Sequence, residues 1–109
     1  MKRGSIVVVA ARGPYTGKPR PAVVVQSDLF NPTHASVTLC PISSDCVDAP
    51  LFRLTLSPGA RTGLEKVSQV MVDKIVSVPR SAVKGEIGQC DARELEAVED
   101  GLRRWLELS

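Results

Sequence analysis

An arginine held between two prolines is the residue of this sequence best suited to bind a phosphate. Arg20 lies between Pro19 and Pro21, where a polar loop runs into the apolar residues 22–25. Each proline fixes its own backbone φ and biases the residue before it towards extended geometry. Arg20 therefore leaves the loop in a defined direction, and a guanidinium held in this way can bind a planar anion. The alternative is a solvated arginine that only marks the start of a strand.

The surrounding sequence predicts the short strands that would position Arg20. Apolar runs rich in β-branched residues, several of them alternating with polar residues, predict strands separated by segments rich in Gly and Pro. We predict strands over residues 5–10, 21–26, 36–42, 50–56, 67–72, 75–78 and 86–90. Residues 67–78 could also form one strand with a break at Asp73-Lys74. Arg20 and the loop of residues 11–19 therefore directly precede the second strand.

One amphipathic helix is predicted over residues 92–106. Asp91 and Glu94 have the spacing of a capping box at its start. Apolar residues recur at helical spacing on one face, at Leu95, Val98, Leu102, Trp105 and Leu106. We expect Trp105 to anchor this face in the core, and close packing to require the glycine at Gly101.

Several short strands followed by one helix predict a mainly β protein, with residues 1–109 forming a single domain. The expected architecture is a small, strongly curved antiparallel barrel closed by the C-terminal helix. In such a barrel the start of the second strand and the end of the third can lie at the same rim. Arg20 would then meet Ser43 and Ser44, and a guanidinium with hydroxyls can bind a phosphate without a metal.

Positive charge is concentrated near Arg20. The formal net charge of +2 is too small to establish nucleic-acid binding by itself. The first twenty residues nevertheless contain five Lys or Arg and no Asp or Glu. Arg12 and Lys18 belong to this group and would add positive charge beside the predicted phosphate site.

Motif content argues against metal, cofactor and membrane sites. Cys40, Cys46 and Cys90, which we expect to be buried, have no metal-binding spacing, and His34 is the only histidine. The sequence has no glycine-rich phosphate loop, and its apolar runs are too short to span a membrane. We therefore expect no metal, no cofactor, no membrane contact and a cytoplasmic location.

Four segments, spread over essentially the whole chain, resemble the MazF/PemK toxin family. They are Arg3-Gly4-x-Ile6-Val7, the segment of residues 18–28 that contains Arg20-Pro21, Cys40-Pro41-Ile42-Ser43-Ser44, and the segment of residues 85–102 that ends in the predicted helix. The order of the matches is as informative as any one of them.

The resemblance implies an SH3-like barrel and a homodimeric toxin of a type II toxin–antitoxin system. It implies a metal-independent, sequence-specific endoribonuclease that cleaves single-stranded RNA through attack of the 2′-hydroxyl, and so inhibits translation and growth. By position, Arg20 would stabilise the transition state and Ser43 would bind the scissile phosphate. A MazE-like antitoxin with an acidic tail would block the RNA groove. We assign RNA binding to Arg12, Tyr15, Lys18, Ser44 and Lys74.

Two departures from the family pattern keep other functions open. Ser5 stands where the family often has an acidic residue, and Val76 stands where it usually has an arginine, which Lys74 or Arg80 would have to replace. The first alternative is a DNA gyrase poison similar to CcdB toxins, which share this fold and use a tryptophan near the chain end, as Trp105 is here. The second is a binding module of the same fold that has lost its activity.

Overall fold

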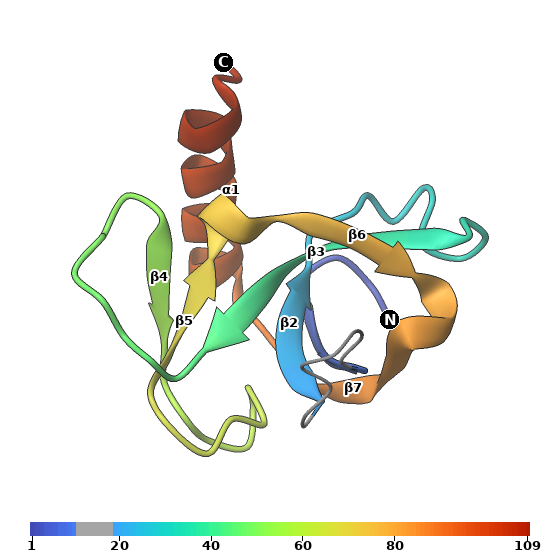
Figure 1. Cartoon of the computed structure of the whole chain (residues 1–109), viewed down its shortest axis with the longest axis horizontal. Coiled ribbons are helices and arrows are strands. Elements are labelled where there is room, and N and C mark those ends of the chain that lie inside the picture. Colours follow the sequence, from blue (N-terminus) through green and yellow to red (C-terminus); the bar gives the residue numbers. More distant parts are fainter. Residues whose placement is uncertain (11–18) are drawn as a thin grey trace, which may run out of the picture.

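The structure is a computed structural model that describes residues 1–10 and 19–109, and its strands form one curved antiparallel sheet (Figure 1). The strands are β1 (Ser5–Val9), β2 (Arg20–Val24), β3 (Ser36–Ser43), β4 (Arg53–Leu56), β5 (Ser68–Met71), β6 (Val76–Pro79) and β7 (Val83–Gln89). The helices are η1 (Val72–Lys74), η2 (Arg80–Ala82) and α1 (Ala92–Leu106). The predicted strands and helix are all present. The last strand begins earlier than predicted, at Val83 instead of residue 86.

β3 is the strand on which the sheet is assembled. The strand order is β4-β5-β3-β2-β1-β7, and β6 pairs with β3 as well. The first half of β3 pairs with β6, from Ser36 to Leu39, and its last two residues pair with β5. β2 pairs with β3 along the opposite edge. Figure 1 shows β3 running across the molecule, with β4 and β5 at one end and β6 at the other.

Both faces of the central strands are buried. Because side chains alternate along a strand, β1, β2 and β3 supply residues to two hydrophobic clusters. One cluster packs beneath α1, β4 and β5 and includes Ile6, Val23, Cys40, Ile42, Leu56, Val70, Val72 and Val98. The other lies within the curve of the sheet and consists of Val7, Ala22, Val24, Val37 and Leu39. Double burial explains why these strands are continuous apolar runs in the sequence.

The predicted mainly β fold with a C-terminal helix is confirmed, but the barrel is not closed. In the described part of the chain, β4 and β7 are the two ends of the strand order and do not pair with each other. The helix does not close the barrel either, because α1 packs against β4 and η1 on the outside of the sheet.

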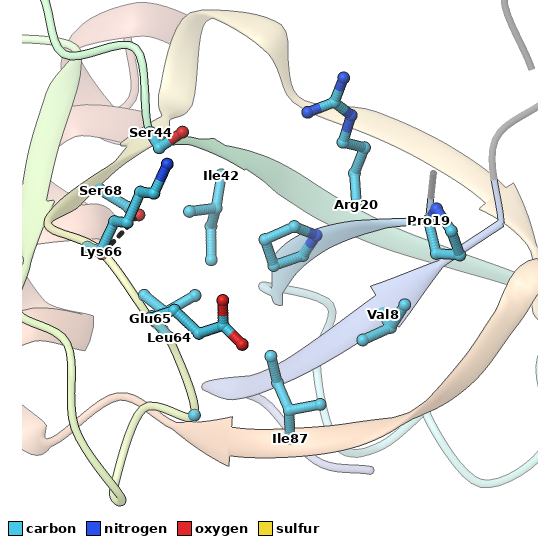
Figure 2. Close-up of a pocket in the computed structure, with 12 residues that line it drawn as sticks. Val8, Pro19, Arg20, Ile42, Ser44, Leu64, Glu65, Lys66, Ser68 and Ile87 are labelled. Atoms are coloured by element: carbon cyan, nitrogen blue, oxygen red, sulfur yellow. Dashed lines mark hydrogen bonds between the residues drawn. The ribbon is translucent and has the colours of Figure 1, made fainter. Parts of the chain in front are cut away.

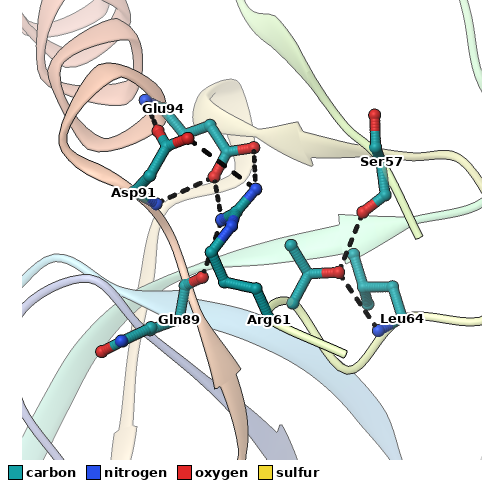
Figure 3. Close-up of polar contacts among 7 residues, drawn as sticks. Ser57, Arg61, Leu64, Gln89, Asp91 and Glu94 are labelled. Carbon is teal, nitrogen blue, oxygen red and sulfur yellow. Dashed lines mark hydrogen bonds and ion pairs between the residues drawn. The ribbon is translucent and has the colours of Figure 1, made fainter. Parts of the chain in front are cut away.

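The start of α1 is fixed by the predicted capping box (Figure 3). The Asp91 carboxylate accepts a hydrogen bond from the Glu94 amide at 2.8 Å, and the Glu94 carboxylate accepts one from the Asp91 amide at 2.9 Å. Arg61 donates to Glu94 at 2.6 Å and to the Gln89 carbonyl at 3.1 Å. The segment before β5 is thereby tied to the junction between β7 and α1.

The middle of α1 packs closely against neighbouring segments, as we predicted from the presence of Gly101 in the sequence. A Cβ atom at Gly101 would lie 3.3 Å from a Val72 methyl group and 3.4 Å from the Leu51 carbonyl oxygen. Glycine therefore lets α1 approach η1 and the segment before β4. No helix of the described residues has the length and apolar character needed to cross a membrane.

Two expectations about burial were wrong. Trp105 is 46% exposed and makes an edge-to-face contact with Phe52 at 5.2 Å, because the end of α1 projects beyond the sheet (Figure 1). The helix contributes Val98 to the core instead. Cys46 is exposed in the loop after β3, whereas Cys40 is buried and Cys90 is half-buried.

Candidate functional site

Strand pairing brings Arg20 and Ser43 to the same end of the sheet. Ala22 of β2 lies opposite Pro41 of β3. Arg20 is two residues before Ala22, and Ser43 is two residues after Pro41. Because β2 and β3 are antiparallel and side chains alternate with a period of two, Arg20 and Ser43 lie at the same end of the two strands and their side chains leave the sheet on the same face.

The geometry around Arg20 leaves its guanidinium accessible. β2 begins at Arg20, which pairs with Val9 of β1, and the side chain of Arg20 is exposed while those of the following residues are buried. Figure 2 shows the guanidinium extending away from the strand. The backbone is therefore anchored in the sheet and the charged group faces solvent, which is the arrangement that anion binding requires.

The Ser43 hydroxyl is oriented by its own loop. Its Oγ accepts a hydrogen bond from the Asp45 amide at 3.0 Å. A serine hydroxyl has one donor hydrogen and two acceptor lone pairs, so this bond leaves the hydrogen available. The half-buried hydroxyl can therefore donate to a phosphate oxygen held by Arg20.

A polar pocket of about 400 Å³ lies beside Arg20 (Figure 2). Arg20 forms one side of it, and Ser44 and Lys66 lie on the other side. The Glu65 side chain extends over the middle of the pocket. The Ser68 hydroxyl donates a hydrogen bond to the backbone carbonyl of Lys66 at 2.9 Å. Two cations, Arg20 and Lys66, and the Glu65 carboxylate between them thus face one pocket.

Sequence reasoning missed Glu65 and Lys66. Their segment is positioned by Gly63, which has a positive φ of 72° and packs against β7 so tightly that a Cβ would lie 2.1 Å from the Ile87 carbonyl oxygen. In the sequence an isolated Glu-Lys pair is typical of a solvated surface. Only the contact between residue 63 and β7 shows that the pair faces Arg20.

The remaining predicted RNA-binding residues are not brought to this pocket. Arg12, Tyr15 and Lys18 lie outside the described residues. Ser44 lines the pocket. Lys74 is exposed at the end of η1, which packs against α1 and β3, and it is not among the residues that line the pocket.

Arg80 does not replace the arginine missing at Val76. Its Nε donates to the His34 carbonyl at 2.8 Å, and its Nη2 donates to the Asn31 carbonyl. Arg80 therefore fixes the turn before β3. The His34 ring accepts a hydrogen bond from the Ser36 amide at 3.1 Å in the same turn.

The thiols of Cys40 and Cys90 are poor candidates for nucleophiles. Burial raises the pKa of Cys40 and of Cys90 to about 12, so both remain protonated at neutral pH. In residues 1–10 and 19–109, no three His, Cys, Asp or Glu side chains are grouped so that they could hold a metal ion. The described charged and polar groups around Arg20 are instead suited to a phosphate.

Fold and site together define a small, curved antiparallel β protein with an exposed arginine and two serine hydroxyls at one end of the sheet. The sequence profile of the family described as "PemK-like, MazF-like toxin of type II toxin-antitoxin system" matches residues 2–106. The chain belongs to this toxin family.

Relatives with established names agree with this assignment. The chain is 48% identical over 89 residues to the probable endoribonuclease MazF of Mycolicibacterium smegmatis, covering 82% of this chain and 81% of the relative. It is 31% identical to endoribonuclease MazF9 of Mycobacterium tuberculosis, covering 99% and 98% of the two chains. Among solved structures, a MazE–MazF structure from Deinococcus radiodurans is similar with a TM-score of 0.83 and 26% identity, covering 100% of this chain and 98% of that one.

Proposed function

We propose that this chain is the toxin of a type II toxin–antitoxin system and acts as an endoribonuclease on single-stranded RNA. The observation that supports the proposal is that Arg20 and Ser43 lie at the same end of the paired strands β2 and β3, in a chain that matches the toxin family over residues 2–106. Two relatives of this chain are named endoribonucleases, which favours this function over a gyrase poison or an inactive binding module. Cleavage of mRNA in the cytoplasm would inhibit translation and growth.

The proposed reaction uses the nucleophile that RNA itself carries. The 2′-hydroxyl loses its proton and its oxygen attacks the adjacent phosphorus, and the bond from phosphorus to the 5′-oxygen breaks. The leaving oxygen takes up a proton, so the products are a 2′,3′-cyclic phosphate and a 5′-hydroxyl. Arg20 neutralises the charge that develops on the phosphoryl oxygens, and Ser43 donates a hydrogen bond to one of them. The proposed step requires no metal.

RNA would also contact the pocket beside Arg20. Ser44 can donate to a neighbouring phosphate, and Lys66 supplies a second positive charge. We propose Arg12, Tyr15 and Lys18 as further RNA contacts, because they directly precede Arg20 in the chain. Lys74 remains a candidate only for a contact away from this pocket.

The proposed partners follow from the family. A structure of a relative contains MazE together with MazF. For this chain we propose a homodimer and an antitoxin whose acidic tail covers Arg20 and Lys66, because carboxylates would compete there with phosphate. We propose that residues 1–109 act as a single toxin domain.

The decisive experiment measures RNA cleavage by the purified protein in EDTA. We expect cleavage of single-stranded RNA with cyclic phosphate ends, and we expect Arg20→Ala to lower kcat/KM by at least about a hundredfold, because one preorganised charge is lost. The matched control is Arg103→Ala, because Arg103 pairs at the surface with Asp100 in α1.

Circular dichroism should show that both variants are folded. Intact RNA together with stalled gyrase on DNA would support the gyrase poison instead. Intact RNA without an effect on gyrase would support the binding module.

A further inference from the structure

The side chain of Gln69 on β5 holds the loop that follows Ser43. Gln69 is 8% exposed. Its Oε1 accepts a hydrogen bond from the Val47 amide at 2.9 Å, and its Nε2 donates one to the Val47 carbonyl oxygen at 2.9 Å. One side chain thus binds both backbone groups of a loop residue, as a residue of a neighbouring antiparallel strand would.

The position of Gln69 in the sheet also fixes the start of this loop. Gln69 lies directly opposite Ser43 in the pairing of β5 with β3. Directly opposite residues of an antiparallel pair extend their side chains on the same face, with Cβ atoms about 4.5–5.5 Å apart. Residues 43–47 therefore form a short loop whose two ends are both attached to Gln69.

Burial does little to keep this loop in place. Residues 44–47 are all exposed, and segments with few buried apolar contacts change conformation easily. The Cys46 thiol adds a weak hydrogen bond to the Val67 carbonyl oxygen, at 3.8 Å. The two hydrogen bonds to Gln69 are made by a buried amide, where water competes little, and they therefore restrict the loop strongly.

The conformation of the loop determines where the Ser43 hydroxyl points. Ser43 Oγ accepts a hydrogen bond from the Asp45 amide at 3.0 Å, and Asp45 is two residues before Val47. A displacement of Val47 would move Asp45 with it, and the bond that orients the hydroxyl would be lost. Catalysis by a positioned group is sensitive to displacements of about 1 Å.

We propose that Gln69 is a positioning residue that acts on the scissile phosphate through Ser43. This inference rests on the proposed ribonuclease function. The role requires no contact between Gln69 and RNA. The Gln69 amide holds residues 43–47 in one conformation, so the Ser43 hydroxyl is aligned before RNA binds. Donors that are aligned in advance stabilise the charge that develops in a transition state most effectively.

The first test is Gln69→Met, which keeps the length of the side chain and removes both hydrogen bonds to Val47. Val47 is 48% exposed, so water can bind its freed amide and the variant should fold. We expect kcat for RNA cleavage to fall about tenfold while KM changes by less than about threefold, because Ser43 is proposed to act in the transition state. A Gln69→Met protein with the kcat of the wild type would overturn the inference.

Gln26→Met is the matched control. Gln26 is half-buried, and its Oε1 accepts a hydrogen bond from the Thr38 amide at 3.0 Å, towards the other end of β3. The same substitution there should leave kcat within about twofold of the wild-type value, because Ser43 is not displaced. Circular dichroism should show that both variants are folded. An equal loss of kcat in the two variants would overturn the inference.

A double-mutant cycle asks whether Gln69 acts through Ser43. In Ser43→Ala there is no hydroxyl left to misplace, so adding Gln69→Met should lower kcat by less than about twofold. A merely structural role of Gln69 predicts the same loss of about tenfold with and without the Ser43 hydroxyl. That second result would refute the positioning role.

Amide hydrogen exchange separates the inference from the ribonuclease function, because it requires no RNA. Exchange at the amides of residues 44–47 should be about tenfold faster in Gln69→Met than in the wild type, and unchanged in Gln26→Met. Faster exchange of the loop in Gln69→Met, together with a wild type that leaves RNA intact, would uphold the attachment of the loop and refute the proposed reaction. Cleavage by the wild type, with loop exchange and kcat unchanged in Gln69→Met, would refute the role of Gln69 alone.

Discussion

Ser43 is the residue whose role can be tested most finely. Ser43→Ala removes the donor proposed for the scissile phosphate, and we expect kcat to fall by about a hundredfold with little change in KM, because the bond strengthens in the transition state. Ser43→Thr keeps the hydroxyl and should retain most activity. Single-turnover cleavage kinetics would measure both.

Ser44 is the matched control for Ser43. It lines the polar pocket, so Ser44→Ala should raise KM more than it lowers kcat. Equal effects of the two alanine variants on kcat would contradict the assignment of Ser43 as the residue at the reacting phosphate.

Arg20 could be found in the sequence, whereas Glu65 and Lys66 could not. The two prolines around Arg20 are a local signal, because they restrict its backbone whatever the fold. Lys66 reaches the site through the contact of Gly63 with β7, which joins segments that are distant in the chain. This tertiary contact has no signature in the local sequence.

At the scale of elements, β4 is joined to η1 by a double hydrogen bond. Arg53 donates to the two Asp73 carboxylate oxygens at 2.9 and 3.1 Å, and both side chains are mostly buried. The hydrogen bonds from Arg53 lower the pKa of Asp73, and the positive charge of Arg53 adds to the effect. The pair thus fixes the geometry between the end of β5 and the neighbouring strand.

The pair makes stability depend on pH. Because the pKa of Asp73 is lower in the folded protein than in the unfolded chain, its stabilising contribution is complete above about pH 4 and is lost as the pH falls towards the folded value. We expect Asp73→Asn to lower the free energy of unfolding by about 1–2 kcal/mol at pH 7. The difference from the wild type should shrink at pH 3.

Urea unfolding at the two pH values measures this effect. Asp100→Asn is the control, because Asp100 pairs with Arg103 on the surface and such pairs contribute little. A difference between wild type and Asp73→Asn that stays constant from pH 7 to pH 3 would contradict the role of the ion pair.

The elements themselves could be predicted well. Capping residues and period-two or period-3.6 patterns are local, so the strands and α1 appear in the sequence close to their observed limits. Trp105 shows where this reasoning failed. Its helical spacing indicated a core position, but burial also depends on how far the sheet extends beneath the helix, and α1 projects beyond the sheet.

At the scale of the whole molecule, one cluster joins both parts of the sheet to α1. Val98 is fully buried among side chains of α1, β3 and β5, including Ile42 and Val70. Val98→Ala would leave a cavity there, and we expect it to lower the free energy of unfolding by about 2 kcal/mol. Guanidinium denaturation would measure the loss.

The exposed alanine variant Leu108→Ala is the control for Val98→Ala, because Leu108 is 59% exposed. It should change stability by less than about 0.5 kcal/mol. If Val98→Ala were equally neutral, the packing of α1 against this cluster would be refuted.

The openness of the barrel could not be predicted from the sequence. Closure depends on whether the two end strands meet, and neither β4 nor β7 carries a local signal for that. The chain instead suggested a closed barrel, because short strands followed by one helix fit both arrangements.

The threefold pairing of β3 also has a consequence for biosynthesis. Its residues 36–39 pair with 76–79, and its residues 42–43 pair with 69–70. Contacts between segments so far apart form late, because a long loop must close first. A nascent chain on the ribosome therefore cannot complete the strand that carries Ser43 until residues up to 79 have emerged. The synthesis of the chain itself thus delays the assembly of a site proposed to cut mRNA until most of the protein has left the ribosome.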